Sequence, residues 1–306
     1  MKRLLLTLLA SALTFGATFA QGDGAAEETR MTLRAEMLRM INRDRARFGL
    51  SPLELDPDAS SIADAYCKLQ IRNHTSGHFT LDGQAPYMRY SFAGGNDGSS
   101  ENAAAWSANF GFSDRALLDM MRRSQEAMMS EVAPHDGHRK SILDPHATHV
   151  GIGVAWDGGE FRIAQEFIRR YVEWRRPLPR GATTSERAAL GGRPKPGYDV
   201  EAITVHHEPF PQALSVTAAN HIATYGLPNS RREYLPRDDY SDGRRGDFQV
   251  GDDGSFAFAV PFPDGPGIYT VVVWVRAHGA RETIAASNVS VRVEAAVPGL
   301  LTAGTR

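Results

Sequence analysis

The chain has 306 residues, and its 34 lysines and arginines nearly balance its 36 aspartates and glutamates. A chain of this length predicts about two domains, and the balanced charge gives no indication of nucleic acid or an anionic membrane as partner. Cys67 is the only cysteine, so no disulfide can form within the chain and packing must supply the stability. We expect Cys67 to be a small core residue.

The first 20 residues have the layout of a secretory signal peptide. Lys2 and Arg3 precede an apolar run from Leu4 to Phe19, and small residues stand ahead of Gln21. Cleavage after Ala20 would leave a secreted protein, extracellular or periplasmic. This apolar run is short for a helix that crosses a bilayer, which needs ~20 residues. No later segment is long and apolar enough to cross one, so no stable transmembrane segment is expected after cleavage. An uncleaved anchor is the alternative.

Three amphipathic helices are predicted in the first half of the chain. The first covers 31–48 and is stopped by Gly49; the second is capped by Asp56 with Pro57 at its first position; the third begins after Ser113. We expect three apolar faces, formed by Met31, Leu38, Ile41 and Phe48, by Ile62, Tyr66 and Leu69, and by Leu117, Met121 and Met128.

The stretch 77–106 is rich in Gly, Asn, Asp and Ser without a sustained period, which predicts a long ordered loop with polar groups. Two alternating runs then flank Asp157-Gly158, which predicts a hairpin. In its first run, Gly151 and Gly153 share one face, where another element must approach the backbone closely. Helices and strands thus make a layered domain that ends near Tyr171.

The rest of the chain changes character. Residues 175–197 are basic and rich in Pro and Gly, which indicates a linker or an extended wrap. The β-rich runs that follow, including 213–219, favour a smaller antiparallel, immunoglobulin-like β-sandwich at 198–296. The predicted organisation is a signal peptide at 1–20, a first domain at 30–174, a linker at 175–197 and the sandwich, an α+β protein as a whole.

Histidines gather between 135 and 149. His135 with His138, and His146 with His149, form two His-x-x-His pairs, and imidazole pairs at short spacing can bind zinc. Against a four-histidine cage, Asp136-Gly137 looks like a helix start, which leaves His135 outside that helix. We expect His149 to begin a strand.

Polar candidates outside this cluster are one imidazole and three carboxylates: His78, Glu101, Glu126 and Glu131. Carboxylates near imidazoles can act as acid and base, or can orient a metal held by the histidines. The alternative for each of these residues, taken singly, is a solvated side chain or a helix cap without a functional role.

Five segments in order resemble the CAP superfamily of cysteine-rich secretory, antigen 5 and pathogenesis-related proteins, in its bacterial extracellular SCP-like branch. They are "INRDRARFGLSPLELD", "GHFTLDGQAPYMR", "ENAAAW", "GHRKSILDPHATHVGIGV" and "FRIAQEF", within residues 33–171. The resemblance implies a three-layer α-β-α sandwich with a cleft lined by two histidines and two glutamates. It assigns His78, Glu101 and His138 to the cleft, and "MMSEV" favours Glu131 over Glu126 as the fourth member. Met128 stands where an aromatic residue is usual.

Three functions follow as hypotheses. The first is an exported protein that binds a lipid, glycan or protein ligand in the His/Glu cleft at or near the cell envelope, with a divalent cation such as zinc on His78 and His138. The second is a metal-dependent hydrolase, although the chain lacks Gly-x-Ser-x-Gly and His-Glu-x-x-His motifs. The third is adhesion or envelope anchoring through the C-terminal sandwich.

Overall fold

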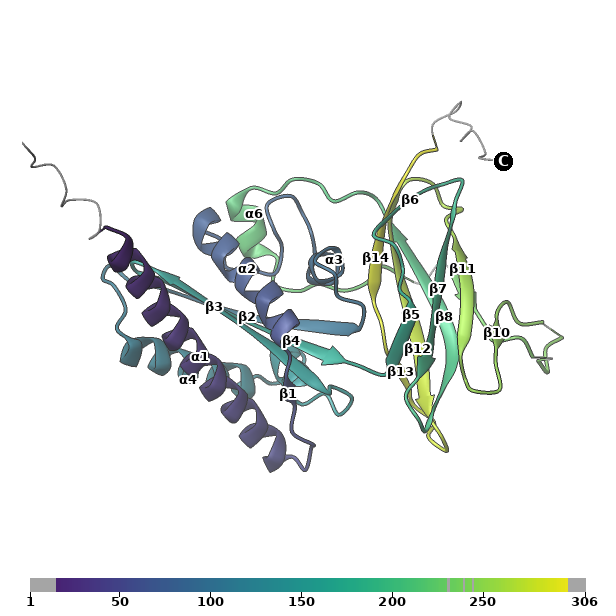
Figure 1. Ribbon diagram of the computed structural model, residues 1–306, viewed down its shortest axis with the longest axis horizontal. Coiled ribbons are helices and arrows are strands. Elements are labelled where there is room, and N and C mark those ends of the chain that lie inside the picture. The colour runs from purple at the N-terminus through teal and green to yellow at the C-terminus, as the bar shows by residue number, and fades with distance from the viewer. Residues whose placement is uncertain (1–14, 230–231, 239, 244, 297–306) are drawn as a thin grey trace, which may run out of the picture.

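A four-stranded sheet lies between two layers of helices in the first half of the chain (Figure 1). The computed structural model describes residues 15–229, 232–238, 240–243 and 245–296. The strand order is β1 (Glu54–Leu55), β3 (His149–Asp157), β4 (Glu160–Arg169) and β2 (Gly98–Ser107), with β1 parallel to β3 and the other pairs antiparallel. The three-layer α-β-α arrangement and the β3–β4 hairpin are therefore confirmed.

Helix α2 (Pro57–Asn73) lies on one face of the sheet, followed along the chain by the short α3 (Pro86–Phe92). Asp56 caps α2 by accepting from the Ala59 N–H, as predicted. A Cβ added at Gly153 would lie 2.2 Å from the carbonyl carbon of Ala63, and one at Gly151 would lie 2.4 Å from that of Ala59. The two glycines thus let α2 approach the sheet, which is the close contact that their spacing predicted.

Helices α1 (Phe15–Arg47) and α4 (Asp114–Ser130) cover the other face, and α5 (Gly137–Ile142) follows. Ser113 caps α4, and the expected apolar face of α4 is buried. The face predicted for α1 is partly wrong, because Met31 is 57% and Phe48 50% exposed. The buried stripe runs instead through Leu33, Met37, Met40 and Ile41, since only the middle of α1 lies over the sheet.

The predicted signal peptide lies mostly outside the described residues, and α1 begins inside it. Within the described part of the chain, no helix combines the length and apolar character needed to cross a membrane.

The predicted loop at 77–106 is wrong in part, because it contains α3 and most of β2. Strand β2 pairs with β4 along its whole length, from Gly98 opposite Arg169 to Ser107 opposite Glu160. The sequence pattern hides this strand because its buried residues include Ser99 and Glu101, whose partners are polar.

The second half of the chain is a β-sandwich. One sheet has the order β10 (Gln249–Val250), β11 (Phe256–Pro261), β7 (Arg187–Pro194), β5 (Val172–Arg176). The other has the order β6 (Gly181–Thr183), β14 (Val289–Glu294), β12 (Gly267–Ala277), β8 (Tyr198–Glu208), β9 (Arg232–Tyr234), and β13 (Thr283–Ala285) pairs with β12. Between the sheets lies an apolar core that includes Leu190, Val205, Phe256, Val271 and Val291.

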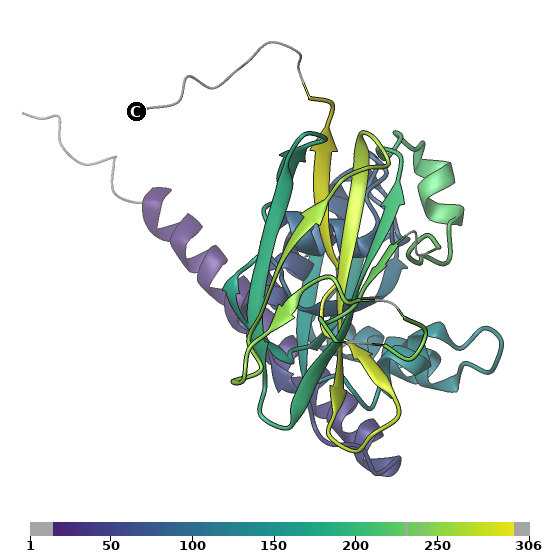
Figure 2. The same cartoon turned by 90° about the vertical axis from the view of Figure 1, so that its right-hand side faces the viewer.

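Two segments of this half differ from their predictions. The linker expected at 175–197 contains β6, β7 and the end of β5, so the sandwich begins at Val172. Its apolar signal is weak because Ala188 and Leu190 alternate with small residues. The run 213–219, expected to be β-rich, leads into α6 (Val216–His221), capped by Ser215. In Figure 2 the sandwich faces the viewer.

The two halves are joined by buried hydrogen bonds. The Gly98 N–H donates to the carbonyl of Ala286 at 2.9 Å, and the Asn288 side chain bonds both the N–H and the carbonyl of Ser99. Arg180 donates to the carbonyls of Ser91 and Gly95. The start of β2 is therefore held by the sandwich as well as by β4.

We expect Gly153→Ala to lower the free energy of unfolding by about 1–3 kcal/mol, because the added methyl must displace the α2 backbone. Chemical denaturation measures this change. Gly111→Ala is the control, since a Cβ there meets its nearest neighbour, the Gly158 carbonyl oxygen, at 3.7 Å. Equal stability of the two variants would contradict the close packing of α2.

Candidate functional site

The four residues His78, Glu101, Glu131 and His138 lie together as two carboxylate–imidazole pairs. The Nδ1 atom of His78 is 2.9 Å from Oε1 of Glu101, and Nδ1 of His138 is 2.5 Å from Oε1 of Glu131. The centroids of the two imidazole rings are 6.0 Å apart. We call these four residues the His/Glu cluster.

The His138 pair is built at the junction of two helices. Glu131 ends α4, and its Oε2 accepts from the backbone N–H groups of His138 and Arg139 in the first turn of α5. One carboxylate thus satisfies free donors at the start of α5 and holds the His138 ring. Glu126, the alternative fourth member, is exposed on α4, and no hydrogen bond joins it to the cluster.

The His78 pair is built on the edge strand β2 and the connection from α2 to α3. The Gly77 carbonyl accepts from the Tyr66 hydroxyl at 2.6 Å and from the Gln70 amide at 2.8 Å, which positions the chain just before His78. Glu101 extends from β2 to meet the ring. The short α5 approaches the same strand, where the Asn102 side chain donates to the His138 carbonyl at 3.0 Å.

Arg89 on α3 stabilises the buried carboxylate of Glu101. Its guanidinium forms an ion pair with Glu101, donates to the His78 carbonyl at 3.1 Å and lies 3.4 Å from the centroid of the Tyr66 ring. Sequence reasoning missed Arg89, although it stands in the quoted segment "GHFTLDGQAPYMR". An arginine within a short apolar helix was the available signal.

A third carboxylate, Glu166, lies directly opposite Glu101 on β4 and is also buried. Burial raises the pKa of Glu166 well above its ordinary value, and the negative charge of Glu101 raises it further. For Glu101, burial acts in the same direction, but the charge of Arg89 and the hydrogen bond from His78 outweigh it and lower the pKa. These opposite shifts favour the ionised form of Glu101 and the protonated form of Glu166.

The charge of Glu101 defines the tautomer of His78. An ionised carboxylate can only accept, so Nδ1 of His78 carries a hydrogen, and in the neutral form of the ring Nε2 keeps its lone pair. The Glu131–His138 pair has the same connection through Nδ1. Each imidazole can thus offer Nε2 to a cation or to a hydrogen-bond donor.

The two pairs differ in exposure. The side chains of His138 and Glu131 are 30% and 24% exposed, whereas those of His78 and Glu101 are 9% and 0% exposed. Tyr225, from the C-terminal half, contributes to this difference, because its ring centroid lies 4.9 Å from that of His78. Sequence reasoning missed Tyr225, which is 124 positions from Glu101 along the chain.

The four histidines between 135 and 149 do not form a metal-binding cage. His135 is exposed, Nε2 of His146 lies 3.4 Å from Glu282, and Nε2 of His149 lies 3.7 Å from Glu54. Among the described residues, no group of three or more His, Cys, Asp and Glu side chains is placed to hold a metal ion. His78 and His138 therefore fit a cation only as two imidazole ligands, each held by a carboxylate.

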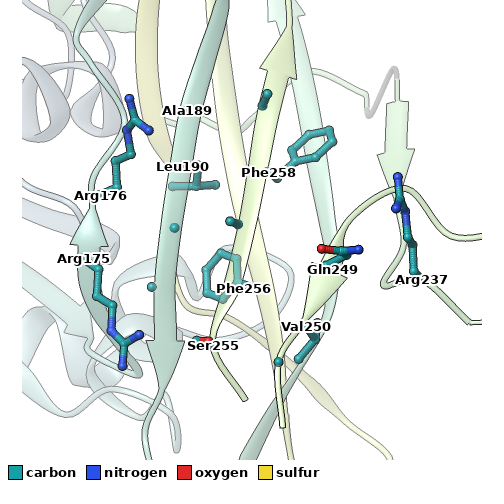
Figure 3. Close-up of a pocket in the computed structure, with 15 residues that line it drawn as sticks. Arg175, Arg176, Ala189, Leu190, Arg237, Gln249, Val250, Ser255, Phe256 and Phe258 are labelled. Carbon is teal, nitrogen blue, oxygen red and sulfur yellow. The ribbon is translucent and has the colours of Figure 1, made fainter. Parts of the chain in front are cut away.

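A separate hollow lies on the outer face of the sheet formed by β5, β7, β11 and β10. This groove has a volume of about 890 Å³. Figure 3 shows Arg175 and Arg176 along one side and Arg237 on the other. Small residues form part of the floor between them: Ala189, Gly191, Ala257 and Ala259. We call this hollow the arginine groove.

We expect Glu166→Gln to become more stable relative to the wild type as pH rises from 4 to 7. The raised pKa of Glu166 means that folding must protonate a carboxylate that is ionised in the unfolded chain above about pH 4.5, and glutamine removes this cost. Denaturation at both pH values measures the difference. Glu126→Gln, an exposed carboxylate on α4, is the control, and an identical pH dependence for both variants would refute a protonated Glu166.

Comparison with known proteins shows what the first domain is similar to. Residues 38–167 match the model of the cysteine-rich secretory protein family, CAP. The uncharacterized protein YkwD of Bacillus subtilis is 25% identical over 161 residues, which are 49% of this chain and 56% of that protein. The chain thus spans little more than half of that curated relative.

Two solved structures are also similar. An extracellular protein containing an SCP domain from Bacillus anthracis has 21% identity and a TM-score of 0.34, covering 44% of this chain and 40% of that one. An outer surface protein of Borrelia burgdorferi has 18% identity and a TM-score of 0.35, covering 47% of this chain and 94% of that one. The family match spans β3 and the whole His/Glu cluster, so residues 38–167 of this chain are a CAP domain.

Proposed function

We propose that this protein is an exported binding protein that holds its ligand at the His/Glu cluster, through Nε2 of His78 and His138. The supporting observation is that a carboxylate contacts Nδ1 of each ring, 2.9 Å away for His78 and 2.5 Å for His138. Such a carboxylate orients an imidazole and increases its basicity as a ligand. The two ring centroids are 6.0 Å apart, and a cation or a donor group could bind between two imidazoles at this spacing.

A divalent cation such as zinc is the ligand component that this chemistry favours, because neutral imidazole is a preferred zinc ligand. His78 and His138 would supply two ligands. The remaining positions would be filled by water or by polar groups of the bound molecule, which we take to be a lipid, glycan or protein of the cell envelope.

Binding is favoured over hydrolysis because, among the described residues, no serine, threonine or cysteine side chain is hydrogen-bonded to either imidazole. The Cys67 thiol is buried in α2, and this burial raises its pKa well above the ordinary value, so it stays protonated. In the described part of the chain, neither His78 nor His138 is hydrogen-bonded to a hydroxyl or thiol group. A hydrolase acting through metal-activated water is the alternative.

The location outside the cytoplasm, secreted or periplasmic, is supported by the basic and apolar start of the chain. The Bacillus anthracis protein named above is described as extracellular. Both agree with a role at or near the cell envelope.

We expect zinc to bind the mature protein in isothermal titration, and to bind more weakly at low pH because a protonated imidazole has no lone pair to donate. His78→Ala and His138→Ala should each abolish most of the binding, and Glu131→Gln should weaken it about 10–100-fold. His135→Ala is the matched control, since His135 is exposed in the same turn region. Unchanged affinity in both histidine variants would overturn the proposed site.

The same variants separate binding from hydrolysis. The zinc-loaded protein is tested with peptide, ester and cell-wall glycan substrates. Turnover that is lost in Glu131→Gln while zinc is retained would favour the hydrolase.

The arginine groove supports adhesion through the sandwich as a second candidate function. Arg175, Arg176 and Arg237 are all exposed there. Asp253 lies 3.4 Å from Arg175, whereas Arg176 and Arg237 have no ion pair with another described residue. Two unpaired guanidinium groups across a floor of small residues favour an anionic polymer of the envelope.

We expect the double variant Arg176→Ser and Arg237→Ser to lose most of its affinity for dextran sulfate, a linear polyanion, measured by fluorescence anisotropy at low salt. The wild-type affinity should fall as salt is added, because exposed charges are screened. Arg115 is exposed on α4, so Arg115→Ser tests a change of charge outside the groove. Equal losses in Arg115→Ser and in the double variant would exclude the groove as the binding surface.

A further inference from the structure

The connection between β8 and β9 leaves the sandwich and lies on the CAP domain. It includes α6, which Figure 1 shows beside α2, away from the strands to which it is joined. The Leu214 N–H donates to the Leu81 carbonyl at 2.8 Å, and Oδ1 of Asn220 accepts from the Ser76 N–H at 2.8 Å. These contacts lie on both sides of His78 along the chain.

Two glycines of the CAP domain permit this contact. A Cβ added at Gly77, next to His78, would lie 2.6 Å from the Ala219 carbonyl oxygen of α6. One at Gly83 would lie 2.3 Å from the Gln212 carbonyl oxygen, and Gly83 also has a φ of +83°. The segment before and after His78 is thus shaped to receive the β8–β9 connection.

Tyr225, in the same connection, meets the cluster itself. The Glu101 N–H donates to the Tyr225 hydroxyl oxygen at 2.5 Å, and the hydroxyl donates to the Glu101 carbonyl at 3.0 Å. Because β2 is the edge strand of its sheet, the backbone of Glu101 that faces away from β4 has no strand partner. Tyr225 supplies both missing hydrogen bonds while its ring packs on His78.

We propose that Tyr225 is a binding-site residue supplied by the C-terminal domain. It positions Glu101 and forms the wall that closes the cluster at His78, so that a ligand reaches His78 only from the side of His138. This inference rests on the proposed function and deepens it. The closed end admits a cation or a slender polar group, while bulkier parts of the ligand remain at the exposed pair, Glu131 and His138.

The exposure of the two pairs agrees with this wall. The side chain of His138 is 30% exposed, whereas that of His78, which packs against the Tyr225 ring, is 9% exposed. Burial raises the pKa of the Tyr225 phenol, so the hydroxyl remains a neutral donor to Glu101 at all pH values at which the site would bind.

The test measures carbethoxylation of individual histidines by diethyl pyrocarbonate, with mass spectrometry of the peptides, in the full chain without ligand. In the wild type, His138 should react faster than His78. In Tyr225→Ala, the rate at His78 should rise on the order of tenfold, equivalent to about 1.4 kcal/mol of lost protection. The rate at His138 should not change. Tyr225→Phe keeps the ring, so His78 should stay protected while the melting temperature falls.

Tyr87→Phe is the matched control, because the Tyr87 hydroxyl also bonds across the two domains, to Glu208 at 2.8 Å. It should leave the rate at His78 unchanged. If Tyr225→Ala does not fold, Tyr225→Leu keeps apolar volume and should raise the rate at His78 by a smaller factor. Equal rates at His78 and His138 in the wild type would contradict the proposal that Tyr225 forms a wall. So would an unchanged rate at His78 in the folded Ala or Leu variant.

A zinc titration of the same variants separates this inference from the proposed function. Loss of His78 protection in Tyr225→Ala, with no zinc binding by the wild type, would leave Tyr225 as the wall and reject the cation. Zinc binding by the wild type, with His78 already open, would reject the wall and leave the proposed function intact.

Discussion

The buried carboxylate of Glu101 is the constraint on which the His/Glu cluster depends. An ionised carboxylate inside a protein is costly unless it is paired and hydrogen-bonded. Here Arg89 supplies the opposite charge and His78 a hydrogen bond, and the side chain of Glu101 is 0% exposed. Each partner is in turn held, since Arg89 stacks on Tyr66 and donates to the His78 carbonyl. His78 is therefore oriented by a network that no ligand is needed to assemble.

The need to stabilise Glu101 and its strand also joins the two domains. Glu101 lies on an edge strand whose sequence, "GSSENAAAWS", has few residues that favour strands. The sandwich completes this edge, with Ala286 bonding Gly98, Asn288 bonding Ser99, and Tyr225 bonding Glu101. Docking of the C-terminal half thus supports the strand that carries the buried charge. The second domain is part of the architecture of the site and not an independent module on a flexible tether.

Local signals explain which parts of the fold could be predicted from sequence. Asp56 and Ser113 act as caps within a few residues of their own helices, and Gly151 and Gly153 report a close approach through their spacing alone. The fourth member of the cluster could be identified only through the order of family motifs. Residue patterns by themselves did not distinguish Glu126 from Glu131 as the fourth member.

The elements that were missed are stabilised by partners distant in sequence. Strand β2 resembles a loop in sequence because its polar residues meet Asn288 and Arg89. Strand β7 resembles a linker because its small residues pair with the distant strand β11, as Gly191 does with Ala257. Glu166 carries no local sign that Glu101 will stand opposite it. Tyr225 is a single aromatic residue in a connection without periodicity, so only the folded chain reveals its role.

The charge distribution links the proposed cation to a ligand. Arg89 already balances Glu101, and the raised pKa of Glu166 favours its neutral form, so the closed half of the cluster has little net charge to offer a cation. Glu131, in the open half, is the carboxylate of the cluster that has no arginine or lysine partner among the described residues. A divalent ion on the two imidazoles would therefore retain positive charge toward the open side. An anionic or carbonyl-bearing group of the ligand would meet it there, which makes the exposed pair the place where ion and ligand are recognised together.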